Sequence, residues 1–269
     1  MNNILEYKGL IYELAARDLK IRYRKPFLGF FWMLIIPFST AFIYKILFSN
    51  FMNMSGAGFP FFIHLITALL PWSYFATAVQ AAPQSILGSK NIINQIAFPK
   101  YLMPVSTVFA NLINFLPTMI ILIIFILAYN IKISLLIVFL PIVILIHTCL
   151  IIGLALIGSS LQVIYRDVEY ILQIMVTILF FLTPGVYTLE YAINRMGPLL
   201  TGIYMLNPFV GLTNLYRIVL IRGYSNSMPI EANFLNTLII PVLFSVGMLF
   251  LGYFVFKKNE RRFSDYLNT

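Results

Sequence analysis

Few side chains in this sequence are placed to act as acids, bases or nucleophiles. The chain has 9 Asp and Glu and 2 His among 269 residues. Asp167 and Glu169 form the only close acidic pair at the end of an apolar block, and paired carboxylates could serve a transferase as general acid and base. His64 and His147 lie inside apolar blocks with no carboxylate one helical turn away, which gives little support to a proton relay.

The sequence also lacks motifs for a nucleotide, a metal or a cofactor. No glycine-rich loop that would cradle phosphates is present, so ATP would have to be bound by another chain. The one cysteine, Cys149, permits no disulfide within the chain and argues against a cysteine-based metal site. We expect no catalytic residue, no metal ligand and no cofactor here, and a membrane-embedded glycosyl- or phosphotransferase is the remote alternative.

The composition is that of a membrane protein. Hydrophobic residues make up 61% of the chain and charged residues 10%, against about 45–50% and about 25% in soluble domains. The apolar residues come in blocks of about twenty, the length that crosses a bilayer core as a helix. This pattern excludes a soluble enzyme, a disordered chain and a fibrous protein, and it predicts an all-α integral membrane protein.

The apolar blocks predict six transmembrane helices within one domain, 1–269. The third and fourth blocks are separated only by residues 130–132, which indicates a tight hairpin. The spans occupy 29–256 and are followed by a tail, 257–269. Their expected ranges are 29–49, 61–80, 103–129, 133–161, 170–189 and 234–256.

The charges predict the orientation of these helices. Lys and Arg number 18 against 9 Asp and Glu, a net charge of +9, and cytoplasmic loops of membrane proteins are enriched in basic residues. If the N-terminus is inside, the inner segments hold most of the basic residues; the outer ones are Lys45, Lys132, Arg195, Arg217 and Arg222. We therefore expect both termini in the cytoplasm and the chain in the inner (plasma) membrane, and we assign the basic excess to topology, not to nucleic acid.

Two segments outside the spans are also apolar. The first, 1–28, puts apolar residues on one helical face, which predicts an amphipathic helix in the membrane interface or one docked against the protein. That face comprises Ile4, Tyr7, Ile11 and Leu14. The second, 190–233, is interrupted by Pro198, Pro208 and Gly223. It predicts outer re-entrant helices between spans five and six, which are tolerated where they are buried in protein or line a cavity.

Aromatic residues make up 16% of the chain. Most Trp and Tyr in membrane proteins form interfacial belts, while a minority could line a conduit in which ring faces stack on sugar C–H groups. Both interpretations stay open. The conduit candidates are Trp32, Phe38, Phe42, Phe181 and Tyr187.

Six short motifs follow one another along the chain. They are Arg17-Asp-Leu-Lys-Ile-Arg-Tyr23, Leu70-Pro-Trp72, Asn91-Ile-Ile-Asn-Gln-Ile-Ala-Phe-Pro99, Tyr165-Arg-Asp-Val168, the segment Pro184 to Tyr187, and Leu206-Asn-Pro208. Together they resemble the permease subunits of ABC-type polysaccharide exporters over nearly the whole chain. The sequence departs from that family at Asn94 and Gln95, where members often carry lysine.

The resemblance implies a division of labour. Two copies of the chain, a homodimer, would form the conduit, and two soluble ATPase subunits would bind ATP and Mg below it. The cargo would be a lipid-linked polysaccharide of the O-antigen type. Alternatives are an exporter of the same fold that carries capsule, teichoic acid, lipid or a drug. Membrane lipids are expected contacts, and nucleic acid is not.

The resemblance also implies roles for particular residues. ATPase coupling would fall to inner loops, with the loop 88–102 as the best candidate for the coupling segment. Arg and Asp in the inner loops could equally be topology anchors. The coupling candidates are Arg17, Asp18, Asn91, Ile92, Ile93, Ile96, Phe98, Pro99, Arg166, Asp167 and Glu169. Arg22, Arg24 and Lys25 could bind the pyrophosphate of the lipid-linked glycan or merely attract anionic lipid. An outer gate would comprise Asn207, Pro208 and Arg217.

Overall fold

The computed structural model describes residues 7–22, 31–95, 98–230, 232–233 and 235–263. Over these ranges the regular elements are all helices. Five of them are long and apolar enough to cross a membrane: Leu34–Phe51, Phe61–Ala81, Leu102–Ala128, Leu135–Ile164 and Leu235–Glu260. The structure therefore confirms an all-helical, multi-pass architecture.

Some of these spans combine two helical types. The first joins α2 (Trp32–Tyr44) to a π-helical stretch, Lys45–Phe51. The next two are α3 (Phe61–Ala81) and α6 (Leu102–Ala128). The fourth joins a 3-10 turn, Leu135–Phe139, to α7 (Leu140–Ile164), and the last joins a π-helical turn, Leu235–Ile239, to α12 (Ile240–Glu260).

The predicted fifth span is shorter than expected. Its helix, α8, covers only Val168–Phe181, whereas the hydrophobic block suggested 170–189. Pro184 lacks a backbone N–H and cannot continue the helical hydrogen bonds, and Gly185 follows it directly. The five long helices and this shorter apolar one account for the six predicted blocks.

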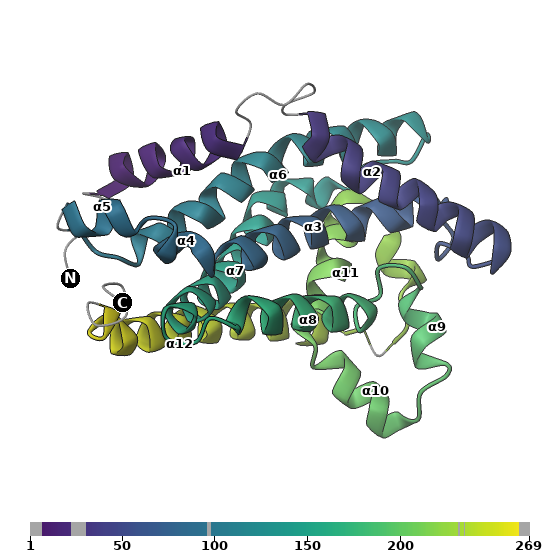
Figure 1. Ribbon diagram of the computed structural model, residues 1–269. Coiled ribbons are helices and arrows are strands. Elements are labelled where there is room, and N and C mark those ends of the chain that lie inside the picture. The colour runs from purple at the N-terminus through teal and green to yellow at the C-terminus, as the bar shows by residue number, and fades with distance from the viewer. Residues whose placement is uncertain (1–6, 23–30, 96–97, 231, 234, 264–269) are drawn as a thin grey trace.

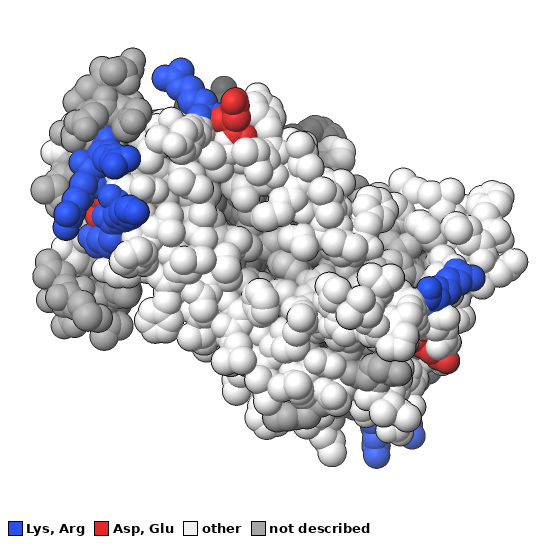
Figure 2. Space-filling model, turned by 90° about the horizontal axis from the view of Figure 1, so that it is seen from below, with Lys and Arg blue, Asp and Glu red and all other residues white. Residues whose placement is uncertain are grey.

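The long helices lie roughly side by side, with short elements at their two ends (Figure 1). At one end, here called the α5 end, lie α4 (Gln84–Leu87), α5 (Lys90–Gln95) and the last turns of α12. The opposite end, the α9 end, carries α9 (Leu189–Ile193). Figure 2 shows Lys and Arg toward both ends of the visible face with an uncharged band between them, which is the charge pattern of a chain embedded in lipid.

The N-terminal helix α1 (Lys8–Arg22) packs against α6. Leu14 and Ala15 are buried, whereas Tyr12 is 67% exposed. Leu14 belongs to a satellite cluster at the α5 end that also contains Ile86, Phe256 and Phe263. The helix thus docks on the bundle through its apolar face; Ile4, which was predicted to share that face, lies outside the described residues.

The main core is centred on α3, most of whose residues are buried. Hydroxyl side chains within this core bond back to their own helix: Thr67 Oγ1 donates to Ile63 O at 3.0 Å, and Thr148 Oγ1 donates to Ile144 O at 2.7 Å. These bonds satisfy polar groups where no water is available. Polar residues can therefore lie at bilayer depth with little penalty.

Two helices follow α9 on the way to α12. They are α10 (Pro198–Met205) and α11 (Pro208–Leu220). Asn207 caps α11, because its side-chain oxygen accepts a hydrogen bond from Phe209 N at 3.0 Å, and Pro208 occupies the first turn, where no N–H is needed. Almost every residue of α11 is buried, so this predicted non-spanning segment is an integral part of the bundle.

Candidate functional site

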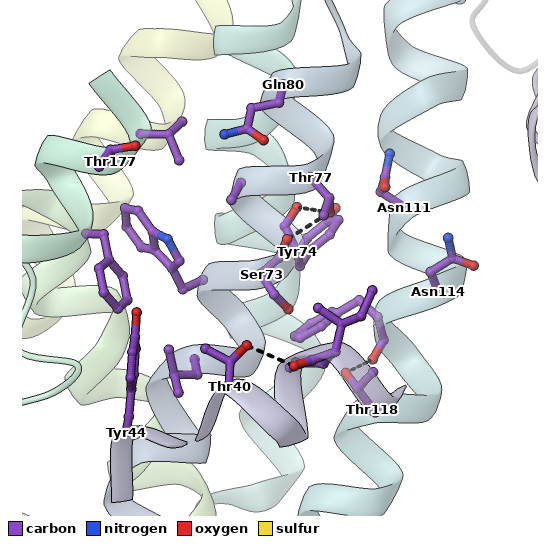
Figure 3. A pocket seen from close by; sticks show the side chains of 18 of the residues that line it. Thr40, Tyr44, Ser73, Tyr74, Thr77, Gln80, Asn111, Asn114, Thr118 and Thr177 are labelled. Carbon is purple, nitrogen blue, oxygen red and sulfur yellow. Dashed lines mark hydrogen bonds between the residues drawn. The ribbon is translucent and has the colours of Figure 1, made fainter. Parts of the chain in front are cut away.

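A cavity of about 740 Å³ lies among α2, α3, α6 and α8 (Figure 3). None of the described side chains that line it carries a charge. Its polar lining consists of Thr40, Tyr44, Ser73, Tyr74, Thr77, Gln80, Asn111, Asn114, Thr118 and Thr177.

Helical spacing collects these polar side chains on facing surfaces. Ser73, Thr77 and Gln80 are about one turn apart on α3, and residues three or four positions apart share a helix face. Thr77 Oγ1 donates to Ser73 O at 2.8 Å, and Thr118 Oγ1 donates to Phe115 O at 2.6 Å. Because a hydroxyl has two acceptor lone pairs besides its donor, these oxygens can still accept hydrogen bonds from a ligand.

Aromatic rings complete the wall of the cavity. Trp72 lies 5.6 Å from Phe180 between ring centroids, and Tyr44 lies 6.1 Å from Phe180. Trp32 and Phe181 also line the cavity. An uncharged cavity that offers ring faces beside hydroxyl and amide groups suits a neutral, polyhydroxylated molecule better than an ion, since binding an ion would require charged or ordered dipolar ligands.

The predicted conduit residues do not all meet here. Trp32 and Phe181 line the cavity. Phe38 instead packs on Phe125 at 5.2 Å, and Phe42 lies outside the lining and is 57% exposed. The Tyr187 hydroxyl donates to Phe181 O at 2.8 Å, beyond the end of α8. Sequence reasoning missed the Ser, Thr, Asn and Gln side chains that line the cavity. The available signal was that these polar residues recur about one helical turn apart on two otherwise apolar helices.

At the α5 end, Arg17 and Asp18 join three elements. Arg17 Nη2 donates to Asp18 Oδ1 at 3.0 Å and to Ser89 Oγ at 3.1 Å, and Thr107 Oγ1 donates to Asp18 Oδ2 at 3.2 Å. These bonds connect α1 to the link between α4 and α5 and to the first turns of α6. Two of the predicted coupling residues are thus placed beside the predicted coupling segment, 88–102.

A second connection reaches the same region from α8. Gln84 Nε2 donates to Glu169 Oε2 at 2.5 Å. Gln162 braces this loop, because its side chain donates to Arg166 O and accepts from Glu169 N, both at 2.9 Å. The side chains of Arg166 and Asp167 are exposed. Among the predicted residues of this loop, Glu169 therefore has the specific contact with α4.

The remaining coupling candidates lie on or near α5. Ile92, Ile93 and Phe98 pack against the satellite cluster, and Pro99 O accepts a hydrogen bond from Leu102 N at 3.1 Å at the start of α6. Burial raises the pKa of the neighbouring Tyr101 above its ordinary value, which keeps this phenol neutral. The described residues do not include Ile96, Arg24 or Lys25, and the side chains of Asn91 and Arg22 are likewise outside the description.

Arg217, a predicted gate residue, is fully buried. Its Nη2 donates to His64 O at 3.1 Å and to Gly185 O at 3.4 Å, and it lies 3.0 Å from His64 Nε2. The guanidinium thereby joins α11 to α3 and to the turn after α8. In the described part of the chain its hydrogen-bond partners are the Thr67 hydroxyl, the His64 ring and carbonyl oxygens, and the carbonyl dipoles compensate the buried charge in place of a carboxylate. Asn207 strengthens the same junction, because its Nδ2 donates to Leu182 O at 2.9 Å.

The described bundle holds an uncharged cavity among helices of membrane-spanning length, which gives it a space where a molecule can be bound or passed. The chain belongs to the ABC-2 type transporter family, whose model matches residues 9–221. It is similar to the O-antigen export system permease protein RfbA of Myxococcus xanthus, with 29% identity over 265 residues that cover 98% of both chains. It is also similar to an RfbA of Klebsiella pneumoniae that bears the same name, with 26% identity over 259 residues, 96% of this chain and 95% of the relative.

Proposed function

We propose that this chain is the transmembrane subunit of an ATP-driven exporter that moves lipid-linked polysaccharide of the O-antigen type across the inner membrane. Membership of the ABC-2 family supports ATP-driven transport, and the names of the two relatives support the cargo. The observation that carries the proposal is the cavity, because its lining of aromatic, hydroxyl and amide groups matches the surface of a sugar chain.

A glycan in transit must be accommodated without being held. Ring faces can cover sugar C–H groups, and hydroxyl and amide side chains can exchange hydrogen bonds with successive sugar hydroxyls. A charged wall would instead fix phosphate or carboxylate groups strongly. The neutral lining, which includes Gln80, Asn114 and Trp72, therefore favours passage over tight binding.

The cavity of one chain is open along α2 and α8. Trp32, Ile36 and Phe181 line it and are 46%, 60% and 63% exposed. A second copy of the chain that packs on these helices would close the wall and bury this apolar surface, which supports a homodimer. In that arrangement α8 serves as the fifth of six spans, and α10 and α11 are the re-entrant helices of the outer side.

Two soluble ATPase subunits, which would bind ATP and Mg, are placed by this proposal at the α5 end. That end carries Arg17, Asp18 and Glu169, and their contacts connect α1, α4, α6 and α8. The α5 end and both termini then face the cytoplasm, where Arg22, Arg24 and Lys25 would meet the pyrophosphate of the cargo. Capsule, teichoic acid, other lipids or a drug are the alternative cargoes.

A pair of matched variants tests the role of the cavity. Gln80→Leu places a branched apolar side chain in the lining, while Gln173→Leu makes the same change at an exposed position of α8 outside it. We expect Gln80→Leu to lower surface polysaccharide several-fold in a strain that depends on this chain, and Gln173→Leu to leave it unchanged. Both variants should reach the membrane in equal amounts on immunoblots. Equal export by the two variants would remove the cavity from the transport route.

The cargo and the partner are tested separately. Cells that lack the chain should accumulate lipid-linked O-antigen on the cytoplasmic side, and the tagged chain should co-purify with a soluble ATPase in mild detergent. If O-antigen still reaches the surface while another polysaccharide or lipid accumulates inside, the cargo assignment is wrong and the exporter class stands. If the chain purifies without an ATPase while other complexes stay intact, the exporter class itself fails.

A further inference from the structure

The last turn of α12 contacts the chain that enters α6. Glu260 Oε1 accepts a hydrogen bond from Lys100 N at 3.3 Å, and Glu260 Oε2 pairs with Lys257 Nζ at 2.8 Å. The same Lys257 Nζ lies 5.8 Å from the centre of the Tyr101 ring. The Glu260 carboxylate therefore bonds directly to Lys100 and reaches Tyr101 through Lys257. Lys100 and Tyr101 are the two residues that precede α6.

Aromatic side chains enlarge this junction. Phe256 and Phe263 are fully buried, and their ring centroids are 5.5 Å apart in an edge-to-face arrangement. Lys100 Nζ lies 5.6 Å from the centre of the Phe263 ring, and the rings of Tyr101 and Tyr253 meet at 6.0 Å. We call the set formed by Tyr253, Phe256, Lys257, Glu260 and Phe263 together with Lys100 and Tyr101 the α12 clasp.

The position of Glu260 is electrostatically unusual. The C-terminal end of a helix carries a partial negative charge, which favours Lys and Arg there and disfavours Glu. Lys257 follows that preference, and Glu260 opposes it. The carboxylate is held by Lys257 within α12 and by Lys100 N from outside the helix, and these two contacts compensate an otherwise unfavourable placement.

The α12 clasp contacts the predicted coupling segment, 88–102, at the C-terminal end of that segment. Ile92, Ile93 and Phe98 pack against the satellite cluster that contains Phe256 and Phe263. On its other side α12 lies so close to α7 that a Cβ on Gly252 would meet Gly153 O at 2.3 Å. A force applied to α5 can thus pass through the clasp into the α7–α12 pair as well as along the chain into α6.

We propose that the α12 clasp positions segment 88–102 for its exchange of force with the ATPase, and that Glu260 is its positioning residue. The inference rests on the proposed function, since it deepens the coupling role of that segment. With the clasp intact, movement of α5 displaces α6 and α12 together. Without the clasp, movement of α5 bends its connection to α6 and is not transmitted to α6 and α12.

Three variants in the complete exporter, reconstituted in liposomes with its ATPase, test this proposal. Glu260→Ala removes both bonds, Glu260→Gln keeps an acceptor for Lys100 N, and Lys258→Ala is the matched control at an exposed position of the same turn. The measurements are hydrogen exchange in peptides from 86–103 and the number of ATP molecules hydrolysed for each glycan exported.

For Glu260→Ala we expect exchange in 86–103 to be roughly tenfold faster, as for loss of a hydrogen bond to a charged group. More ATP should be hydrolysed for each glycan exported, while Glu260→Gln and Lys258→Ala should stay near wild type. A purely structural role would lower hydrolysis and export in proportion and leave their ratio unchanged.

If hydrogen exchange in 86–103 is unchanged in Glu260→Ala, the clasp does not hold this segment. If exchange is faster but the number of ATP molecules hydrolysed for each glycan is unchanged, the clasp has no role in coupling. Failure of the proposed function looks different, because then the wild-type complex itself exports no glycan. In that case hydrogen exchange alone decides whether the clasp holds the segment.

Discussion

The contact between α7 and α12 makes a sharp prediction about one glycine. A Cβ on Gly252 would lie 2.3 Å from Gly153 O and 2.9 Å from its Cα. Non-bonded carbon atoms normally stay about 3.5–4.0 Å apart, so Gly252→Ala requires the two helices to separate by roughly 1 Å at this point. Both partners are backbone atoms, and no rotation of a side chain can relieve the overlap.

The expected cost follows from two opposing effects. Overpacking costs typically 1–3 kcal/mol, and this overlap belongs at the upper end, about 3 kcal/mol, because close glycine contacts are what lets membrane helices associate. Alanine regains about 1 kcal/mol of helix propensity over glycine, which leaves a net loss of about 2 kcal/mol in the free energy of unfolding.

The same helix offers a matched control. A Cβ on Gly247 has no heavy atom within 4 Å, so Gly247→Ala should gain up to about 1 kcal/mol. Thermal unfolding of the two purified variants in one detergent should therefore differ by several degrees, with Gly252→Ala the less stable. If Gly252→Ala unfolds at or above the temperature of Gly247→Ala, the close approach of α7 and α12 does not exist in the molecule.

Two further outcomes can be checked on the same material. Arg217→Met removes the guanidinium that donates to the carbonyls of His64 and Gly185, which should cost about 2 kcal/mol and lower the unfolding temperature in detergent; unchanged stability would show that the buried guanidinium contributes nothing net. Glu169→Ala breaks the contact with α4 and should reduce ATP-driven export several-fold, whereas Asp167→Ala, at an exposed position, should leave export near wild type. Equal losses in both variants would point to the charge of the loop as the cause.

The long spans were predictable because apolar blocks of bilayer length have few alternatives to a membrane helix. The fifth was not, since averaged hydrophobicity continues through Leu182 while Thr183, Pro184 and Gly185 end the helix. A proline inside a helix is tolerated elsewhere, at Pro71 and Pro117. After α8 a proline and a glycine are adjacent, a pair that a hydrophobic window does not register.

The candidate site was less accessible from the sequence. Ionisable side chains are the usual markers of function inside a membrane, whereas this cavity is lined by neutral ones such as Ser73, Thr77 and Gln80. The sequence places Arg217 among the outer basic residues and predicts it as a gate residue, yet it is bonded to His64, 153 positions earlier in the chain. Such a pairing depends on how α3 and α11 pack, and no local pattern encodes it.

The buried guanidinium also constrains how the chain can be made. Taking an unpaired guanidinium into an apolar bundle is costly unless hydrogen-bond acceptors are already in place. His64 and Gly185 precede Arg217 by 153 and 32 positions, so a chain threaded into the bilayer from its N-terminus presents both carbonyls before α11 emerges from the ribosome. A circularly permuted chain that began with α11 would have to insert the same charge with no acceptor in place, and its biogenesis should fail at that step.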